Sequence, residues 1–173
     1  MAVVLHFSKR LLERPAPGSL PGIALRQFHD DRDIPLWLEL RNRAFARAKP
    51  GVLGWGATDF AREMLDRPWW SPDRLWFALA DSPGADQPLP VGTVALASRE
   101  IATSSVAVVH WLAVLATHRR QGVARLLMQA LEQRAWDLGQ RDIFLETHDG
   151  WIAAQRLYES LGYQQVPGAT KMS

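Results

Sequence analysis

The sequence contains no cysteine. This absence excludes a disulfide scaffold, a thiolate metal site and a cysteine nucleophile, and it makes the cytoplasm the expected compartment. No apolar run approaches the roughly 18 residues that a membrane-crossing helix needs. The apolar patch at the start comes before Lys9 and Arg10, whereas a secretory signal carries its charge first. We therefore expect neither export nor a membrane partner.

An excess of charge of one sign is also lacking. The formal net charge is only +2, and the arginines are spread along the chain without a basic stripe or a base-stacking aromatic motif. These features argue against nucleic acid as a partner. The histidines and carboxylates show no metal-ligand spacing such as His-x-x-x-His, and no serine lies in a Gly-x-Ser-x-Gly elbow. We expect no metal and no covalent acyl-enzyme.

What the chain does have is enough apolar sequence for one folded domain. It has 173 residues, of which 47% are apolar and 22% are charged, the ordinary balance of a globular protein. Pro15, Pro17 and Gly18 punctuate the start, so we expect residues 1–20 to form an arm or a short edge strand. Residues 21–173 are expected to form a single domain.

Hydrophobic periodicity and turn residues divide that domain into elements. In the first half we expect a strand over 23–28, helices over 34–45 and 59–65, and strands over 75–80 and 91–98. In the second half we expect strands over 106–115, 143–146 and 163–166, with helices over 123–138 and 151–161 between them. This alternation indicates a right-handed crossover with parallel strands. The predicted fold class is α/β, with a mixed, twisted central sheet and helices on both faces.

The junction between the strand 106–115 and the helix 123–138 carries the sharpest chemical signal. Gly122 lets the backbone approach a ligand closely, and the first-turn N–H groups of the helix lack intrahelical partners at the positive end of its dipole. Arg119 and Arg120 add positive charge. Together they predict an anion site that suits a diphosphate. The alternative is an ordinary capped helix with solvated arginines.

Two motifs in this half resemble those of a known family. Arg119-x-x-Gly122-x-Ala124, ahead of a leucine-rich helix, is similar to the acyl-CoA signature of the GNAT superfamily of N-acetyltransferases. The segment Ala154–Tyr163, with its Leu-Tyr pair and its closing Leu-Gly-Tyr, resembles the last helix of that family. The first motif differs from a Walker loop and from the dinucleotide fingerprint, because Gly-Lys-Ser/Thr and three spaced glycines are missing. The resemblance covers residues 106–166.

The resemblance implies an N-acetyltransferase that uses acetyl-CoA, with an acceptor-side half at about 21–100 and an acyl-CoA-binding half at about 101–166. In the family, two parallel strands splay apart to form the acyl-CoA cleft, and the backbone around Val114 would bind the pantetheine arm and polarise the thioester carbonyl. Trp151 stands where the family often has an Asn near the cofactor. The implied cofactor-binding residues are Leu112, Ala113, Val114, Arg119, Arg120, Gln121, Gly122, Val123, Ala124, Arg125, Ala154 and Tyr158.

Tyr158 is the candidate general acid. It matches the family's common acid, which protonates the departing CoA thiolate, and an ordinary pKa of about 10 suits that transfer. The spacing of Tyr158 from Ala154 and Leu161 also fits a side chain that only packs on a helix face.

His110 is the first candidate for a base that accepts the amine's proton. It lies four residues before Val114, so strand alternation predicts the same face, and the arylalkylamine N-acetyltransferases of the superfamily carry a histidine at the matching place. A packing role is the alternative. Glu146 and then His148 are further candidates, and Glu146 would equally suit a helix cap or the surface.

The acceptor side is expected between Trp37 and Trp70, because in the family the first two helices and their loop contact the acceptor. This aromatic-rich stretch would suit an aromatic or apolar amine, or a cation held by cation–π contact; the alternative is a filled core. Asp59, Glu63 and Asp66 would hold an ammonium group or form a solvated face. We expect a small-molecule amine, with a peptide acceptor or a non-catalytic acyl-CoA-binding subunit as alternatives.

The end of the chain leaves little room for the family's usual final strand. Residues 166–173 follow the last predicted strand and contain Pro167 and Gly168. Open strand edges invite pairing. We therefore expect either a very short last strand or a partner chain, as in a homodimer, over the exposed edge.

Overall fold

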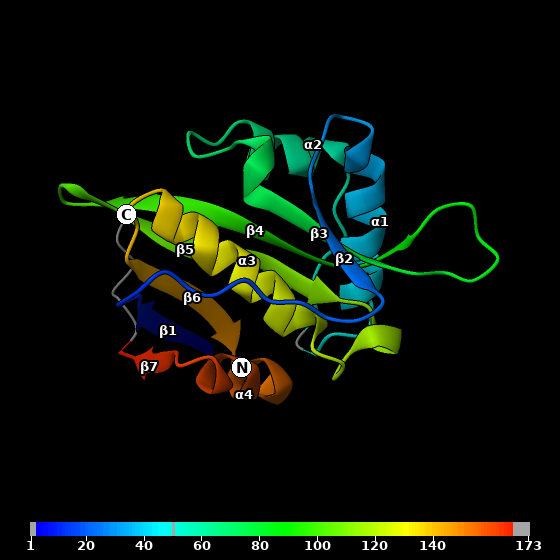
Figure 1. Ribbon diagram of the computed structural model, residues 1–173. Helices are drawn as coiled ribbons and strands as arrows, with labels where there is room; N and C mark the ends of the chain where they lie inside the picture. Colours follow the sequence, from blue (N-terminus) through cyan, green and yellow to red (C-terminus); the bar gives the residue numbers. More distant parts are fainter. Residues whose placement is uncertain (1–2, 50, 168–173) are drawn as a thin grey trace.

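A computed structural model of the chain describes residues 3–49 and 51–167. Its centre is a seven-stranded mixed sheet with the strand order β2-β3-β4-β5-β6-β1-β7 (Figure 1). The strands are β1 (Val4–Arg10), β2 (Ile23–Gln27), β3 (Leu75–Ala80), β4 (Leu89–Ile101), β5 (Ser104–Val114), β6 (Asp142–His148) and β7 (Gln164–Val166). The helices are α1 (Asp33–Phe45), α2 (Ala57–Phe60) with a π-helical turn over Ala61–Leu65, α3 (Val123–Asp137) and α4 (Ile152–Ser160).

The predicted mixed sheet with helices on both faces is confirmed. Successive strand residues point to opposite faces, and Gly92 and Thr93 of β4 show which helix covers each one. Thr93 accepts a hydrogen bond from the indole of Trp37 in α1. A Cβ at Gly92 would instead lie 3.0 Å from Val123 and 3.1 Å from Leu127 in α3. Thus α1 covers one face and α3 the other, and within the described ranges no helix is long and apolar enough to span a bilayer.

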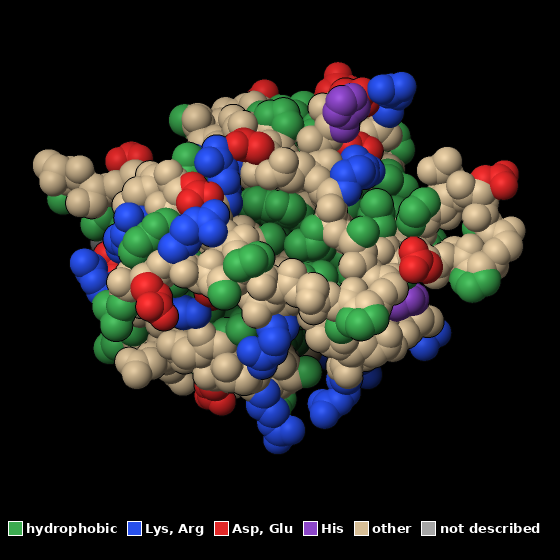
Figure 2. Space-filling model, in the orientation of Figure 1, with side chains coloured by type: hydrophobic (Ala, Val, Ile, Leu, Met, Phe, Trp, Pro, Cys, Tyr) green, Lys and Arg blue, Asp and Glu red, His purple; other side chains and the backbone are tan. Residues whose placement is uncertain are grey.

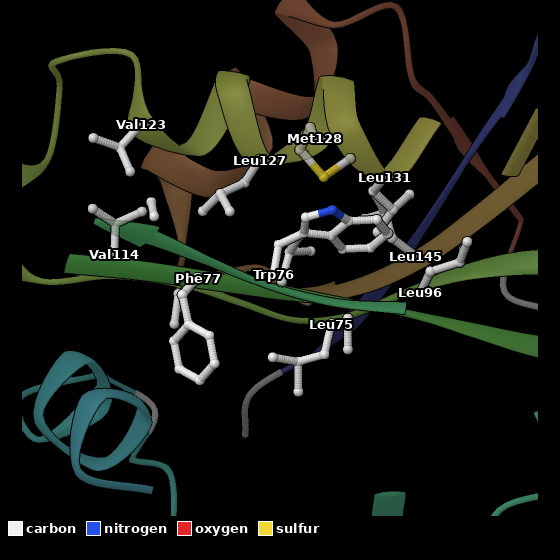
Figure 3. Packing of buried hydrophobic residues seen from close by; sticks show 14 of the residues in the cluster. Leu75, Trp76, Phe77, Leu96, Val114, Val123, Leu127, Met128, Leu131 and Leu145 are labelled. Carbon is white, nitrogen blue, oxygen red and sulfur yellow. The ribbon is translucent and has the colours of Figure 1, made fainter. Parts of the chain in front are cut away.

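Apolar side chains on both faces of the sheet form the core. Figure 3 shows Trp76 of β3 beneath Met128 and Leu131 of α3, whereas Phe77, the next residue, points to the opposite face. This alternation of large buried side chains is what a strand covered on both faces requires. The helix α3 ends at Gly139, whose φ of +78° closes it as expected from the sequence.

The start of the chain departs from its expected place. Residues 4–10 form β1, which pairs antiparallel with β6 over its whole length and with β7 on its other side, so β1 is an internal strand and the expectation of an arm or edge strand is wrong. Glu132 of α3 connects β1 to the rest of the fold. Lys9 Nζ of β1 lies 2.8 Å from Glu132 Oε2, and the Tyr163 hydroxyl donates to Glu132 Oε1 at 3.0 Å. This long-range contact leaves no local trace in the sequence.

The segment 11–20 then runs along the outside of α3 (Figure 1). Arg14 pairs with Asp137 near the end of the helix, and Gln133 donates to the carbonyl of Pro15. The segment reaches Leu20, whose side chain lies 3.6 Å from the position of a Cβ at Gly122. The segment therefore contacts α3 near both of its ends before the chain enters β2.

The last strand, β7, is only three residues long and lies at the edge of the sheet. It pairs with β1 rather than with β6. A very short final strand, one of the two expected outcomes, is therefore what the structure has up to residue 167; residues 168–173 lie outside the described part.

We predict that Gly92→Ala destabilises the protein by about 1–3 kcal/mol, because the added methyl group overpacks the contact between β4 and α3. Urea unfolding measures the change. Gly54→Ala is the matched control, since the nearest atom to its added Cβ, in Asn42, is 3.9 Å away. Equal stability of the two variants would contradict the close approach of α3 to the sheet.

Candidate active site

The strands β5 and β6 run parallel but pair over a very short stretch. Their paired residues are Ala107 with Ile143 and Val108 with Phe144. Beyond Val108, β5 continues to Val114 alongside β4, and β6 continues alongside β1. The carboxyl ends of these two neighbouring strands therefore separate, as the family resemblance implied.

The backbone of Val114 faces this separation. Leu115 N–H donates to Val91 O on the β4 side at 2.8 Å. Because N–H directions alternate along a strand, the N–H and carbonyl of Val114 point the opposite way, toward β6. The carbonyl accepts a hydrogen bond from Arg119 Nε at 3.0 Å. The Val114 N–H is left as a main-chain donor facing the gap.

The amino end of α3 lies a few residues further along the same segment. Gly122 precedes the helix with φ +90°, and no side chain caps the first turn, which also contains no acidic residue. Arg120 has φ +59°, a left-handed conformation that is rare for a residue with a Cβ. The turn thus presents uncapped helix amides at the positive end of the dipole.

The three arginines of this segment have different surroundings. Arg119 Nη2 also donates to the carbonyl of Ala44 at the end of α1 at 2.8 Å. Its side chain therefore joins β5 to α1, although the residue is exposed. Arg125 donates to Ser160 Oγ at 2.8 Å, which links α3 to α4. Arg120 is exposed, so its contact with an anion at this turn stays a prediction.

The prediction that His110 and Val114 lie on the same face of the sheet is wrong. Ala95 pairs with His110 and Thr93 pairs with Ala113, so two steps along β4 match three along β5. The extra residue forms a β-bulge at Trp111, which has φ +51°. A bulge reverses the alternation that follows it. His110 consequently lies on the α1 face, whereas Val114 lies on the α3 face, close to Val123 (Figure 3).

His110 is surrounded by aromatic side chains on the α1 face. Its ring centroid lies 5.3 Å from that of Trp111 and 6.1 Å from that of Trp69. Burial lowers the pKa of His110 to about 4, and the carboxylate of Glu63 only partly opposes this shift. The imidazole is therefore neutral at neutral pH, able to accept a hydrogen bond but weak as a base.

Tyr158 of α4 is buried on the other face of the sheet. Its ring lies 6.2 Å from Phe7 and 6.0 Å from Tyr163. Burial raises the pKa of Tyr158 above its ordinary value. The phenol is thus a proton donor throughout the physiological range. Both the packing role and the acid role fit this position.

The remaining candidate bases lie at the end of β6. Glu146 is exposed and lies beside His6, with 3.6 Å between Oε1 and Nδ1. His148 is partly buried, and its ring lies 4.8 Å from Trp151. Glu146 therefore has the surroundings of a surface residue, and His148 belongs to the aromatic cluster at the open end of the sheet.

The aromatic stretch 37–70 is largely interior. Trp37 and Phe60 are fully buried, with ring centroids 5.1 Å apart, so the packing alternative holds for them. Asp59 and Glu63 form ion pairs with Arg62, and Glu63 also with Arg67, as a solvated helix face would. Over the upper part of the face visible in Figure 2, acidic and basic side chains are likewise mixed, whereas basic side chains prevail along its lower edge.

Sequence reasoning missed Arg41. This residue of α1 is only 1% exposed, and its guanidinium lies over the rings of Trp55 and Trp111. The signal was present, because Trp37, Arg41 and Phe45 recur every four residues and so share one face of the helix. A charged residue at a core position of that pattern indicates a special environment.

Comparison with known proteins adds to this geometry. A family model described as "Acetyltransferase (GNAT) family" matches residues 35–163. A mycothiol acetyltransferase from Thermobispora bispora is 34% identical over 152 residues, which are 86% of this chain and 49% of that protein. The chain thus spans about half the length of the curated relatives it matches.

Solved structures share the fold. A GCN5-related N-acetyltransferase from Sphaerobacter thermophilus superimposes with a TM-score of 0.72 at 21% identity, over 94% of this chain and 48% of that one. A chain of the NatC complex bound to Gag peptide and CoA superimposes with a TM-score of 0.67 at 19% identity, over 84% of this chain and 86% of that one. At these identities the likeness establishes the fold alone.

We predict that His110 makes stability depend on pH. The unfolded imidazole takes up a proton near pH 6.5 and the folded one only near pH 4, so stability falls as the pH drops from 6.5 to about 4. At pH 5 this effect amounts to about 2 kcal/mol relative to pH 7. Urea unfolding of wild type and His110→Asn at both pH values measures it; His118→Asn, at a partly exposed site, is the control. An unchanged pH dependence in His110→Asn would contradict the burial of this ring.

Proposed function

The chain belongs to the GNAT acetyltransferase family, and we propose from this premise that it transfers an acetyl group from acetyl-CoA to an amine. One arrangement carries the proposal. Within one short segment, the Val114 N–H faces the gap between diverging parallel strands, and the uncapped amino end of α3 follows at Gly122. A ligand with an anionic end and an extended arm fits both features.

The donor groups of the chain match acetyl-CoA. The amides of the turn from Arg120 to Ala124 would hold the diphosphate, with the exposed Arg120 adding charge. The main chain from Leu112 to Val114 would pair with the pantetheine arm, and Ala154 of α4 would line its far side. Acetyl-CoA supplies the activated acyl thioester, so the protein needs only to position the reactants and to move protons.

The residues near the gap would serve a direct attack of the acceptor amine on the thioester carbonyl of acetyl-CoA. The Val114 N–H would donate to the thioester carbonyl oxygen, where negative charge develops. Tyr158 would protonate the departing thiolate, and its raised pKa keeps the phenol protonated until then. His110, neutral and on the acceptor side, would accept a hydrogen bond from the amine or from a water beside it, with Glu146 as the further candidate base.

The proposed acceptor is a small-molecule amine. On the acceptor side, the ring of Phe45 in α1 stacks on Trp151, at the start of α4, with centroids 5.7 Å apart. This stack connects α1 with the segment that follows β6. Aromatic side chains at the approach would suit a small molecule better than a folded protein surface.

We predict that Gly122→Asp abolishes most acetyl-CoA binding, because it places a side chain and a negative charge where the diphosphate would lie. Calorimetric titration with acetyl-CoA measures the affinity. Gly139→Asp is the matched control, since Gly139 has a similar positive φ, +78°, at the other end of α3. Equal affinity of the two variants would refute the assigned turn.

We predict that Tyr158→Phe slows turnover at least about tenfold while acetyl-CoA affinity stays close to wild type, as removal of one proton donor should. Release of free CoA measures the rate. Tyr163→Phe is the control, because Tyr163 is also buried but hydrogen-bonds to Glu132 away from the gap. A Tyr158→Phe rate equal to that of wild type would remove Tyr158 from the mechanism.

A further inference from the structure

Arg41 is a buried cation without an anionic partner. It is 1% exposed, and among the described residues no carboxylate lies within ion-pairing distance; the nearest acid that acts on its pKa is Asp59, through space. Burial lowers the pKa of Arg41 to about 10, so it stays charged at neutral pH. An unpaired buried charge is costly, which makes its presence beside the bulge informative.

Aromatic faces surround this charge. The guanidinium carbon lies 4.2 Å from the ring centroid of Trp111, 4.4 Å from Trp55 and 5.7 Å from Phe45. These rings stabilise the cation through their faces but supply no negative charge. The aromatic wall that would suit a ligand ammonium group is thus already occupied by a cation of the protein. A second positive charge would be repelled there.

One edge of the guanidinium has no hydrogen-bond partner at its buried Nε within residues 3–49 and 51–167. Nη1 donates to Asn42 Oδ1 at 2.9 Å and to the carbonyl of Leu53 at 2.8 Å. The edge formed by Nε and Nη2 is one that binds a carboxylate through two parallel hydrogen bonds.

Two further donors in the same cluster lack partners. The indole nitrogens of Trp111 and Trp151 are buried without an acceptor in the part of the chain that the structure describes. Phe45 lies between them, 5.9 Å from Trp111 and 5.7 Å from Trp151. Arg and Trp nitrogens only donate hydrogen bonds. A ligand rich in acceptor atoms would satisfy all of these donors.

We propose that the acceptor amine carries a carboxylate, which binds Arg41 and the neighbouring indole N–H groups on the α1 side of the bulge. This inference rests on the proposed acetyl transfer and specifies the class of its acceptor. A carboxylate is favoured over a phosphate because the cluster offers one positive charge and a planar donor edge. The bound carboxylate would also orient the amine toward His110, which adjoins Trp111.

The competing explanation is that Arg41 only anchors the loop between α1 and α2. Its bonds to Asn42 and Leu53 fit that role, but they engage Nη1 alone. A loop anchor would affect stability and leave acceptor choice unchanged. Acceptor choice is therefore the property to measure.

The experiment compares acceptors that differ in one group, at saturating acetyl-CoA, by release of CoA. The pairs are L-phenylalanine with L-phenylalaninamide, glycine with glycinamide, and O-phosphoethanolamine with ethanolamine. We expect about tenfold or greater kcat/KM for the carboxylate member of at least one amino acid pair, as a charge-assisted hydrogen bond would provide. Equal rates within both amino acid pairs, or a preference for the phosphate above both carboxylates, would overturn the proposal.

Variants separate recognition from folding. Arg41→Met should reduce the acid-to-amide ratio to about one while acetyl-CoA affinity is retained, and Arg41→Lys should keep only part of the ratio because it lacks the planar edge. Arg43→Met is the matched control, at an exposed arginine of the same helix that pairs with Glu39. If the acid-to-amide ratio of kcat/KM is unchanged in Arg41→Met, residues other than Arg41 determine the selectivity and the inference is refuted.

A binding measurement covers the case in which none of these amines is acetylated. Quenching of tryptophan fluorescence by phenylacetate and by phenethylamine measures binding, and Trp55, Trp111 and Trp151 of the cluster contribute to this signal. We expect phenylacetate to bind about tenfold more tightly, and Arg41→Met to remove that difference; equal or weaker binding of phenylacetate would overturn the proposal. Failure of the wild type to bind acetyl-CoA would refute the proposed function instead, and the two failures are thus distinguishable.

Discussion

The strands β5 and β6 pair at only two positions, and the arrangement of the site follows from the separation of their carboxyl ends. A sheet normally satisfies its main-chain groups across each strand boundary. Here β5 carries an extra residue at Trp111, stays with β4, and turns the Val114 N–H away from β4, toward the side of β6. Arg119 then binds the Val114 carbonyl and the end of α1, which holds the bulged strand where β6 no longer pairs with it.

The same bulge gives the two faces of the sheet different roles. Before it, His110 and Trp111 both contact the α1 side; after it, Val114 contacts α3. The proposed donor substrate therefore meets the main chain on one side, while the acceptor side is lined by side chains. Such a division would let the acceptor specificity change through side-chain substitutions, since the thioester is recognised by backbone groups common to any sequence.

Local features of the fold were predictable from the sequence, because they depend on neighbouring residues. The helix over 123–138, the positive φ of Gly139 and the turn at Gly122 follow from periodicity and from the freedom of glycine. The face of the sheet on which His110 lies was mispredicted, because a single inserted residue reverses strand alternation. Nothing in the sequence around Trp111 indicates this β-bulge. The burial of Arg41 was missed although its spacing from Trp37 and Phe45 places it on an aromatic face of α1, because a charged residue is rarely buried and the exposed side is the usual expectation for it.

The position of β1 has a consequence for how the protein forms. Val4 pairs with His148, so β1 finds its partner only after all the residues between the two strands have emerged from the ribosome. Contacts between such distant segments slow folding. Until β6 arrives, the apolar side of β1, including Phe7, has no strand to pair with, and the nascent chain presents an unpaired strand that invites association with other chains. Completion of the sheet at β1 therefore depends on the synthesis of β6.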